Sequence, residues 1–260
     1  MPRARTALTI AGSDSGGGAG IQADLRVFVR LGVFGTTAIT AVTAQNTLGI
    51  QRWMSIGAAL VRAQIDAVAT DLRPDAVKSG MLANADIVRA VASALRKHGL
   101  RRYVLDPVIL ASSGTPLLDR AGVRALRREL IPLATIVTPN LAEAAALTGE
   151  HVADVAAMRR AALLLVDRDG AQAALVTGGH LTGTTTVDVL YDGKVAPRLF
   201  RHRRVMTRHT HGTGCTLSAA IAARLALGDP LPTAVAAALR YVHRALLHPP
   251  SLGTGPGPIG

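Results

Sequence analysis

The segment from Ala7 to Thr43 reads ALTIAGSDSGGGAGIQADLRVFVRLGVFGTTAITAVT and carries the pattern that decides the fold. Its first apolar residues, Ala7 to Ala11, predict a short buried strand, and Thr36 to Thr43 predict a second one. Between them, a glycine-rich turn is followed by a helical stretch from about Ala19 to Leu31. Short strands joined by a helix pair in parallel through a right-handed crossover. The segment therefore predicts the start of a parallel sheet covered by helices.

The same alternation continues along the rest of the chain. Further strands are predicted at Ala76–Lys78, Tyr103–Leu105, Thr135–Val137 and Ala173–Thr177, and a hairpin at Thr184–Leu190 and Val195–Phe200. Helices are predicted at Ala58–Asp71, Ala85–His98, Ala121–Leu130, Leu141–Leu147, Val155–Asp169, Gly214–Leu227 and Leu231–Leu247. No linker or repeat interrupts the pattern before a Gly/Pro-rich tail at 251–260. We therefore expect one α/β domain, residues 1–260, with a largely parallel sheet covered on both faces.

The composition narrows the class of protein. The chain has 260 residues, of which 49% are hydrophobic, and a single cysteine. These values exclude a disordered chain and a disulfide scaffold. The apolar stretch behind the basic N-terminus is too short for a secretory signal, and no segment has the length of uncharged sequence that spans a membrane. We expect a cytoplasmic protein.

The formal charge of +12 is compatible with nucleic acid, an anionic membrane surface or a phosphorylated ligand as partner. Only seven aromatic residues are present, and no Lys/Arg-rich segment has an aromatic stacking partner, so binding of nucleic acid is not expected. The densest basic run, Arg201 to Arg204 with Arg208, is interpreted as a solvated strand edge.

The turn Gly12-Ser13-Asp14-Ser15-Gly16-Gly17-Gly18-Ala19-Gly20 matches neither common phosphate-binding motif. A P-loop would need Lys-Ser/Thr after Gly17, where Gly18-Ala19 stand, and a dinucleotide fingerprint would need a third glycine at Ile21. What remains is a turn with free N–H groups at a helix start, which can approach a ligand closely.

Polar residues follow several strands, at the edge where ligands of parallel sheets bind. Amides such as Gln45 can bind the edge of a heterocycle or cap a turn. The carboxylates of Asp106 and Glu143, with the amide of Asn140, suggest an oxygen-rich Mg²⁺ site. Asn140 three residues before Glu143 is also typical of a helix N-cap.

The segment from Thr210 to Thr216, THGTGCT, is the strongest local signal. Two glycines before an apolar helix predict an anion hole, with Cys215 where the helix dipole would lower its pKa. A buried cysteine that only packs the helix is the alternative. His209 and His211 are interpreted as loop histidines, although a Cys215–His211 nucleophile pair is conceivable, and these three residues are too few for a zinc site.

Together these segments resemble the hydroxymethylpyrimidine/phosphomethylpyrimidine kinases of thiamine biosynthesis, of the ribokinase-like superfamily. The matching motifs are Ala11 to Asp24, Thr43 to Gly49, Lys78-Ser79-Gly80-Met81-Leu82, Asp106-Pro107-Val108, Thr138 to Glu143, Gly178-Gly179-His180 and His211-Gly212-Thr213-Gly214-Cys215. The sugar kinases of the superfamily carry Gly-Thr-Gly-Asp where this chain has Gly-Thr-Gly-Cys. The resemblance implies a three-layer αβα sandwich, ATP and Mg²⁺ as co-substrate and cofactor, and a homodimer.

The resemblance also implies a role for individual residues. The pyrimidine pocket would be lined by Gly12, Asp24, Gln45, Met81 and Val108, with Asp24 and Gln45 bonding the ring nitrogen and the exocyclic amine. The ATP side would be formed by Asn140, Thr177, Gly179 and Thr210, and Mg²⁺ would be organised by Asp106 and Glu143 with Asn140. The backbone of Gly212, Thr213 and Gly214 would form the anion hole, with Cys215 as the base beside the substrate hydroxyl.

One residue departs from the family pattern, because Thr177 stands where the family usually has a lysine that meets the ATP phosphates. We expect an Arg of the basic strand Arg198 to Arg208, which leads into the anion-hole loop, to replace that charge, with Arg203 and Arg204 as the candidates to test. Pyridoxal or pyridoxine kinase activity, alone or as a second activity, is the nearest alternative. A catalytically impaired phosphate- or nucleic-acid-binding protein is a more distant one.

Overall fold

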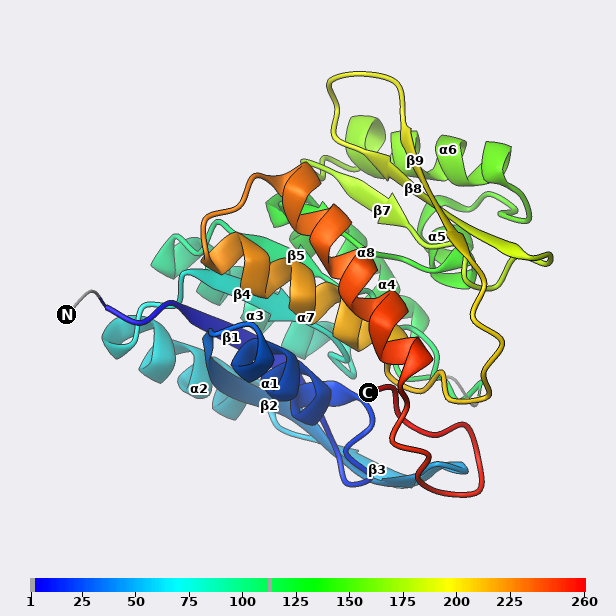
Figure 1. The fold of residues 1–260 in the computed structure, drawn as a ribbon. Coiled ribbons are helices and arrows are strands. Elements are labelled where there is room, and N and C mark those ends of the chain that lie inside the picture. Colours follow the sequence, from blue (N-terminus) through cyan, green and yellow to red (C-terminus); the bar gives the residue numbers. More distant parts are fainter. Residues whose placement is uncertain (1–2, 112–113) are drawn as a thin grey trace.

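The computed structural model describes residues 3–111 and 114–260. In these ranges, nine strands form one sheet in the order β3-β2-β1-β4-β5-β6-β7-β8-β9 (Figure 1). Six strands are parallel: β1 (Thr6–Asp14), β2 (Phe34–Asn46), β4 (Ala76–Ser79), β5 (Tyr103–Leu105), β6 (Ile136–Val137) and β7 (Ala174–Val176). Three are antiparallel to their neighbours: β3 (Gly49–Ser55), β8 (Thr185–Tyr191) and β9 (Arg198–Arg203). The predicted α/β class with a largely parallel sheet is confirmed.

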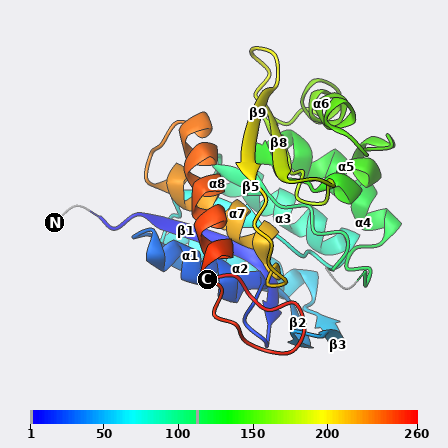
Figure 2. The same ribbon diagram turned by 45° about the vertical axis from the view of Figure 1, so that its right-hand side comes forward.

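Helices cover both faces of the sheet, as expected (Figures 1 and 2). One face carries α1 (Gly20–Arg30), α7 (Thr213–Ala226) and α8 (Leu231–Leu247). The other carries α2 (Ala58–Asp71), α3 (Ala85–His98), α4 (Arg120–Ala125), α5 (Leu141–Thr148) and α6 (Val155–Leu163). Strand residues alternate between the two cores: Leu8 and Ile10 pack with α2 and α3, whereas Ala7 packs with α7 and α8. Because each face of the sheet packs against its own set of helices, the sheet is the middle one of three layers.

Several boundaries differ from the prediction. The predicted helices at 121–130 and 155–169 begin as α4 and α6 and end in π-helical turns, Leu126–Leu130 and Leu164–Arg168. β2 continues to Asn46 and turns into β3, a strand that was not predicted. Both sides of β3 carry partly exposed residues, so the segment lacks the apolar run or the clean alternation that marks a strand. Gln45 therefore lies within a hairpin strand and not behind a strand end.

Two predictions about the surface can be compared with the structure. β9 is the last strand of the sheet, and its Arg201 and Arg203 are exposed, which confirms the solvated strand edge. Among the described residues, no helix has the length and hydropathy needed to cross a membrane. Residues 1–2 and 112–113 of the predicted domain lie outside the described part.

The strand order places a ligand site. The chain runs from β1 to β2 on one side and later crosses to β4 on the other side of β1. Such a reversal leaves a crevice at the carboxyl ends of the central strands, because the connections leave in opposite directions. The segments that follow β1, β4, β5, β6 and β7 meet at this edge of the sheet.

Candidate functional site

An apolar cluster lies beyond the carboxyl ends of β1 and β4. Met81 and Leu117 belong to its buried part, and Val108 and Trp53 pack against it. Gly12 borders the cluster, since a Cβ atom at Gly12 would lie 3.1 Å from the Met81 sulfur. The structure thus brings together three of the predicted pyrimidine-binding residues, Gly12, Met81 and Val108.

A polar group of three side chains lies beside the glycine-rich turn. His211 Nε2 lies 3.0 Å from Asp14 Oδ2 and 3.2 Å from Gln45 Nε2. Asp14 also accepts hydrogen bonds from the backbone N–H groups of Gly16 and Ala19, both at 2.8 Å. Burial raises the pKa of Asp14, but the bonds from His211 and the turn outweigh it and lower this pKa below its usual value. His211 is therefore a fixed part of the site, in contact with the residue predicted to bind the pyrimidine.

The structure places Asp24, for which the resemblance implied a contact with the substrate, away from the surface of the pocket. The Asp24 side chain is fully buried between α1 and the sheet. It accepts hydrogen bonds from Thr9 Oγ1 at 2.6 Å and from Lys78 Nζ at 2.8 and 3.0 Å. The resemblance to the kinase family implied a place in the pocket, but the phase of α1 turns the side chain to the sheet.

Lys78 is the buried partner of two carboxylates and was not predicted as a site residue. Its side chain is inaccessible to solvent, and Nζ lies 3.8 Å from Asp106 Oδ2 in addition to the contact with Asp24. Burial alone would lower the pKa of Lys78, but Asp24, Cys215 and Asp106 raise it above its usual value. Lys78 is therefore a fixed positive charge below the site.

The N-terminus of α7 lies where the anion hole was predicted, but its donors differ, because the Thr213 N–H donates to the Thr210 carbonyl at 3.3 Å. Gly212 precedes the helix with φ +80°, a conformation that favours glycine. The Thr213 hydroxyl donates to the Thr210 carbonyl at 2.7 Å and fixes the loop before the helix. Gly214 is exposed, and a Cβ atom there would meet nothing within 4 Å. Because the first turn of a helix has no internal partner for its N–H groups, Gly214 and Cys215 can donate to an anion.

The expected lowering of the Cys215 pKa is wrong. Burial raises the pKa of this thiol to about 12, and Asp106 and Asp24 add to the increase. The charge of Lys78 and a hydrogen bond from the Gly20 backbone act in the opposite direction but do not compensate. The helix dipole is therefore outweighed by the poorly solvated surroundings, and Cys215 is a protonated thiol at neutral pH.

Asp106, Asn140 and Glu143 meet where β5 and β6 end. The Asn140 side chain accepts from the Glu143 backbone at 3.0 Å, and Glu143 Oε2 accepts from the Asn140 backbone at 2.9 Å, so the N-cap interpretation is confirmed as a capping box at the start of α5. Asp106 accepts from Ser218 Oγ at 2.9 Å. Burial and the nearby Asp106 raise the pKa of Glu143 to about 8.

The chemistry of these carboxylates fits Mg²⁺. A buried carboxyl group whose pKa is raised by a second carboxylate nearby, as that of Glu143 is by Asp106, can be neutralised by a divalent cation with oxygen ligands. Within the part of the chain that the structure describes, no group of three or more His, Cys, Asp and Glu side chains could hold a metal. A site with Asp106 and Glu143 alone is sufficient for Mg²⁺, which commonly takes one or two carboxylates and completes its shell with phosphates and water.

The ATP side is built from the loops after β6 and β7. Thr177 pairs with Asn140 in an isolated parallel bridge, and its N–H donates to the Pro139 carbonyl at 2.9 Å. The Gly178 N–H donates to Asp188 Oδ1 at 2.9 Å. Two of the predicted ATP-binding residues, Asn140 and Thr177, are thus adjacent, and Asp188 of β8 holds the following loop.

Arg204 does not offer the free charge that was expected of it. Its guanidinium donates to the carbonyls of Gly183 at 2.8 Å and Gly179 at 2.7 Å, and also to that of Leu181. Arg204 therefore holds the loop that contains Gly179, because each of its three guanidinium nitrogens donates to a loop carbonyl. Arg203 is exposed and remains the candidate for phosphate neutralisation.

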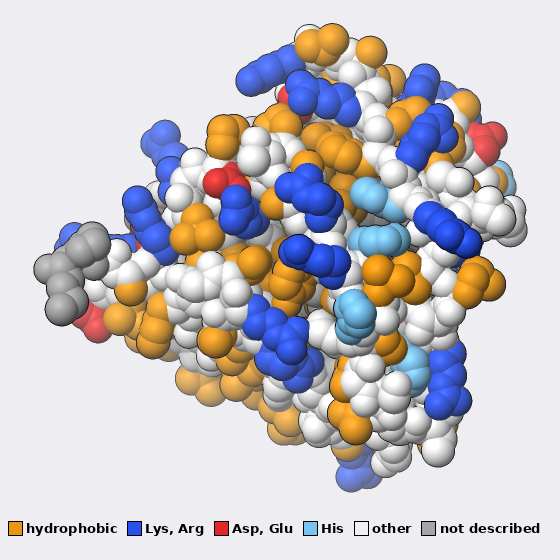
Figure 3. All heavy atoms as spheres, viewed as in Figure 1, with side chains coloured by type: hydrophobic (Ala, Val, Ile, Leu, Met, Phe, Trp, Pro, Cys, Tyr) orange, Lys and Arg blue, Asp and Glu red, His pale blue; other side chains and the backbone are white. Residues whose placement is uncertain are grey.

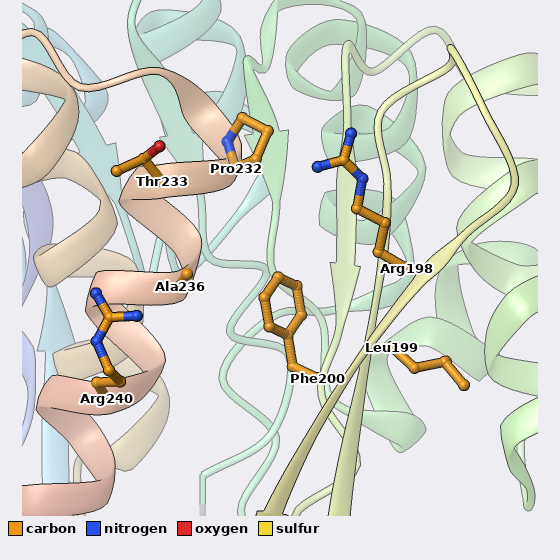
Figure 4. Close-up of a pocket in the computed structure, with 7 residues that line it drawn as sticks. All are labelled: Arg198, Leu199, Phe200, Pro232, Thr233, Ala236 and Arg240. Carbon is orange, nitrogen blue, oxygen red and sulfur yellow. The ribbon is translucent and has the colours of Figure 1, made fainter.

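A surface pocket of about 470 Å³ lies elsewhere on the molecule, between β9 and α8 (Figure 4). It is lined by Arg198, Leu199, Phe200, Pro232, Thr233, Ala236 and Arg240. Arg198 is the first residue of β9, and β9 has the direction of the parallel strands. The pocket therefore lies toward the amino ends of those strands, opposite the crevice, and is no part of the candidate site.

Comparison with known proteins decides the family. The family model of phosphomethylpyrimidine kinase matches residues 14–260. The chain belongs to the phosphomethylpyrimidine kinase family. A hydroxymethylpyrimidine/phosphomethylpyrimidine kinase of Rhizobium meliloti is 53% identical, over 97% of this chain and 95% of the relative. The corresponding protein of Bacillus subtilis is 47% identical, over 97% and 93%.

Solved structures agree with this membership of the phosphomethylpyrimidine kinase family. A phosphomethylpyrimidine kinase from Clostridium difficile has a TM-score of 0.82 at 38% identity, over 93% of this chain and 99% of that one. An ADP complex of Bacillus subtilis pyridoxal kinase has a TM-score of 0.91 at 38% identity, over 99% and 97%. The ribokinase-like architecture expected from the motifs is thereby confirmed.

Sequence reasoning missed three residues of this phosphomethylpyrimidine kinase site that act through other residues. Lys78 had a visible signal, because a charged residue in the buried strand Ala76–Ser79 needs a partner. Asp188 had the same signal, because it is a charged residue among the apolar residues of β8. Ser218 had none, since a serine in a small-residue helix gives no hint of the carboxylate it meets.

Proposed function

We propose that the protein phosphorylates hydroxymethylpyrimidine with ATP and then phosphorylates the monophosphate to the diphosphate, as a step of thiamine biosynthesis. The observation that carries the proposal is the Gly-Thr-Gly-Cys start of α7, joined by the Gln45–His211 contact to the hairpin beside the apolar cluster of Gly12, Met81 and Val108. The family relationship supports the same reaction.

The chain's own groups act mainly by alignment and by charge compensation. The free N–H groups of Gly214 and Cys215 bind the oxygen charge of the phosphoryl group that is transferred, at the positive end of α7. Gln45 and the apolar wall of Met81 and Val108 hold the heterocycle so that its hydroxymethyl group faces this hole. Such positioning lowers the barrier most, because the transition state of phosphoryl transfer is loose.

Asp106 and Glu143 hold Mg²⁺ in this proposal, with Asn140 fixing Glu143 through the capping box. When bound there, Mg²⁺ would neutralise part of the phosphate charge of ATP. Ser218 and Lys78 keep the Asp106 carboxylate in place from below.

Cys215 lies beside the expected position of the substrate hydroxyl, where the thiol hydrogen-bonds it and takes part in removing its proton. Because its raised pKa keeps the thiol protonated in the free protein, almost none of it is the thiolate that could accept the proton, and its contribution is small compared with that of the anion hole. In the second phosphorylation the nucleophile is an ionised phosphate oxygen, which needs no base.

Because Thr177 stands where the family usually has a lysine, another residue has to supply a positive charge to the ATP phosphates. Since Arg204 is engaged with loop carbonyls, Arg203 takes this role in our proposal. Thr177→Lys should lower the KM for ATP, and Arg203→Ala should raise it. The idea fails when neither substitution changes the KM for ATP.

The test of the main proposal is incubation of the purified protein with ATP, Mg²⁺ and, in parallel, hydroxymethylpyrimidine, its monophosphate and pyridoxal, followed by mass spectrometry. Phosphorylated products from both pyrimidines are expected. The proposal is overturned when neither pyrimidine is phosphorylated.

Pyridoxal phosphorylation is the second candidate activity. It is favoured by the likeness to Bacillus subtilis pyridoxal kinase, which extends over 99% of this chain at a TM-score of 0.91. The incubation with pyridoxal in the same experiment tests this activity, and formation of phosphorylated pyridoxal would establish it. The homodimer and the cytoplasmic location stay predictions, and light scattering of the purified protein tests the first.

A further inference from the structure

The C-terminal segment, residues 251–260, does not trail from α8 but returns to the candidate site. The two ribbon views show it curving from the end of α8 past the tip of the β2–β3 hairpin (Figures 1 and 2). The His211 N–H donates to the Gly257 carbonyl at 3.1 Å, and His211 and Pro258 form a parallel bridge. The Gly255 N–H donates to Thr47 Oγ1 at 3.3 Å. The segment thus connects two parts of the site.

Three alternating glycines let the segment lie against these two parts. A Cβ atom at Gly253 would overlap the side chain of Thr47, and one at Gly255 would overlap the Thr47 carbonyl. A Cβ atom at Gly257 would overlap the ring of His209 and lie 2.6 Å from the Leu252 carbonyl. Contacts this close leave no room for any other residue. The segment is therefore packed against the rest of the protein, and Gly257, Pro258 and Ile259 are buried.

Both parts that the segment joins carry functional side chains. Thr47 lies two residues beyond Gln45, at the turn of the β2–β3 hairpin. His211 precedes Gly212, which starts the anion hole, and its ring contacts Gln45 and Asp14. The segment is therefore bonded on one side to the pyrimidine-binding hairpin and on the other to the phosphate-binding loop.

We propose that residues 252–258 are a positioning strap that sets the distance between Gln45 and the anion hole, with Gly255 and Gly257 as its positioning residues. The inference rests on the proposed kinase function and adds to it a structural determinant of pyrimidine binding. The strap touches neither substrate. It acts by holding Gln45 and the anion hole at the spacing at which both bind the substrate at once, so that a displaced strap weakens substrate binding.

The decisive variant is Gly257→Ala, which forces the strap away from His209. Gly57→Ala is the matched control, because Gly57 has an ordinary φ of −61° and no atom would lie within 4 Å of the added methyl group. We expect Gly257→Ala to raise the KM for hydroxymethylpyrimidine about tenfold, with a much smaller change in kcat, because misregister weakens binding before it affects a bound substrate. Gly57→Ala should leave both constants unchanged.

A milder variant covers the case in which Gly257→Ala does not fold. Thr47→Val keeps the shape of the side chain and removes only the acceptor of the Gly255 N–H. It should raise the same KM about threefold, the effect expected for one lost hydrogen bond. Unchanged KM values in both folded variants overturn the proposal.

Amide hydrogen exchange separates this proposal from the function on which it rests. The His211 N–H should exchange faster in Gly257→Ala than in Gly57→Ala, since its acceptor is displaced. This measurement needs no substrate. A wild-type protein without turnover would contradict the kinase function, whereas unchanged exchange at His211 would contradict the strap.

Discussion

Replacing Lys78 tests the buried ion pairs that lie beneath the site. Lys78→Met leaves the carboxylates of Asp24 and Asp106 buried without their cation, which is expected to cost about 3–5 kcal/mol of unfolding free energy. Urea denaturation measures the loss. The double variant Lys78→Met/Asp24→Asn should recover part of it, because one of the uncompensated charges is removed as well. A double variant less stable than Lys78→Met alone would contradict the ion pair.

Cys215 can be tested by comparing the two phosphorylations within one variant. Cys215→Ala should lower the kcat of the first phosphorylation by about tenfold, less than the roughly 100-fold or more of a well-matched general base because the thiol is protonated, and leave the second nearly unchanged. The reason is that only the first nucleophile has a proton to lose. Steady-state rates with the two pyrimidines measure the ratio. Equal losses in both reactions would show that Cys215 acts through the anion hole or packing instead.

Individual residues also show which parts of the site could be predicted from the sequence. Gly12, Met81 and Val108 could be predicted only through the resemblance to a known kinase family, to whose motifs they belong; the structure brings them together because strand ends meet at one edge of the sheet. The pairing of Asp24 with Lys78 could not, because it depends on the rotation of α1 above two strands that are far apart in sequence. The pKa of Cys215 was predicted with the wrong sign for a related reason, since burial in the assembled fold outweighs the local dipole.

At the scale of elements, the loop after β7 is held by Arg204 on one side. Arg204→Lys keeps the charge but cannot reach three carbonyls, because an ammonium group lacks the planar fork of donors. The loop should loosen, and the KM for ATP should rise about tenfold, as expected for two lost hydrogen bonds. Arg201→Lys on exposed β9 is the control and should have no effect. An unchanged KM in Arg204→Lys would show that the loop does not need the clamp.

The same loop is held on its other side by Asp188, which predicts a pH dependence of stability. Burial raises the pKa of Asp188 to about 6, whereas the unfolded chain has an ordinary value of about 3.9. Between these values the folded protein binds more protons than the unfolded chain, so this residue lowers stability as the pH rises from about 4 to about 6.

Asp188→Asn should abolish that decrease. The amide oxygen can still accept from the Gly178 N–H, and no charge has to be buried, so the unfolding free energy at about pH 8 should increase by about 2–3 kcal/mol. Urea denaturation across this pH range measures both effects. A variant with the pH slope of the wild type would show that Asp188 does not carry it.

The elements that were predicted and missed differ in how they are stabilised. The parallel strands were found because burial on both faces makes them short apolar runs between helices. β3 was missed because an edge strand exposes both of its sides and is defined by pairing with β2, as in Val42 with Met54. The segment at 251–260 was recognised only as Gly/Pro-rich, since the contacts that order it lie with Thr47, His209 and His211.

At the scale of the whole molecule, the charge of +12 has to be reconciled with a small anionic ligand. Lys and Arg side chains are spread over the face that α1, α7 and α8 form, and few Asp and Glu side chains are visible among them (Figure 3). A distributed positive field attracts any polyanion, and its effect declines with ionic strength. Binding of a single-stranded nucleic acid would need, in addition, aromatic side chains on which the bases stack.

Salt dependence separates the two partners. ATP is held by short-range contacts at the N-terminus of α7 and by Mg²⁺, so its KM should rise only a few-fold between about 0.05 and 0.2 M salt. A random single-stranded oligonucleotide has only the distributed field, so its binding should fall by about 1,000-fold over that range and compete poorly with ATP at the higher salt. Fluorescence anisotropy of the oligonucleotide, measured beside the kinetics, tests both. Tight oligonucleotide binding that persists at the higher salt would show that the basic face has its own ligand, because unspecific attraction cannot survive screening.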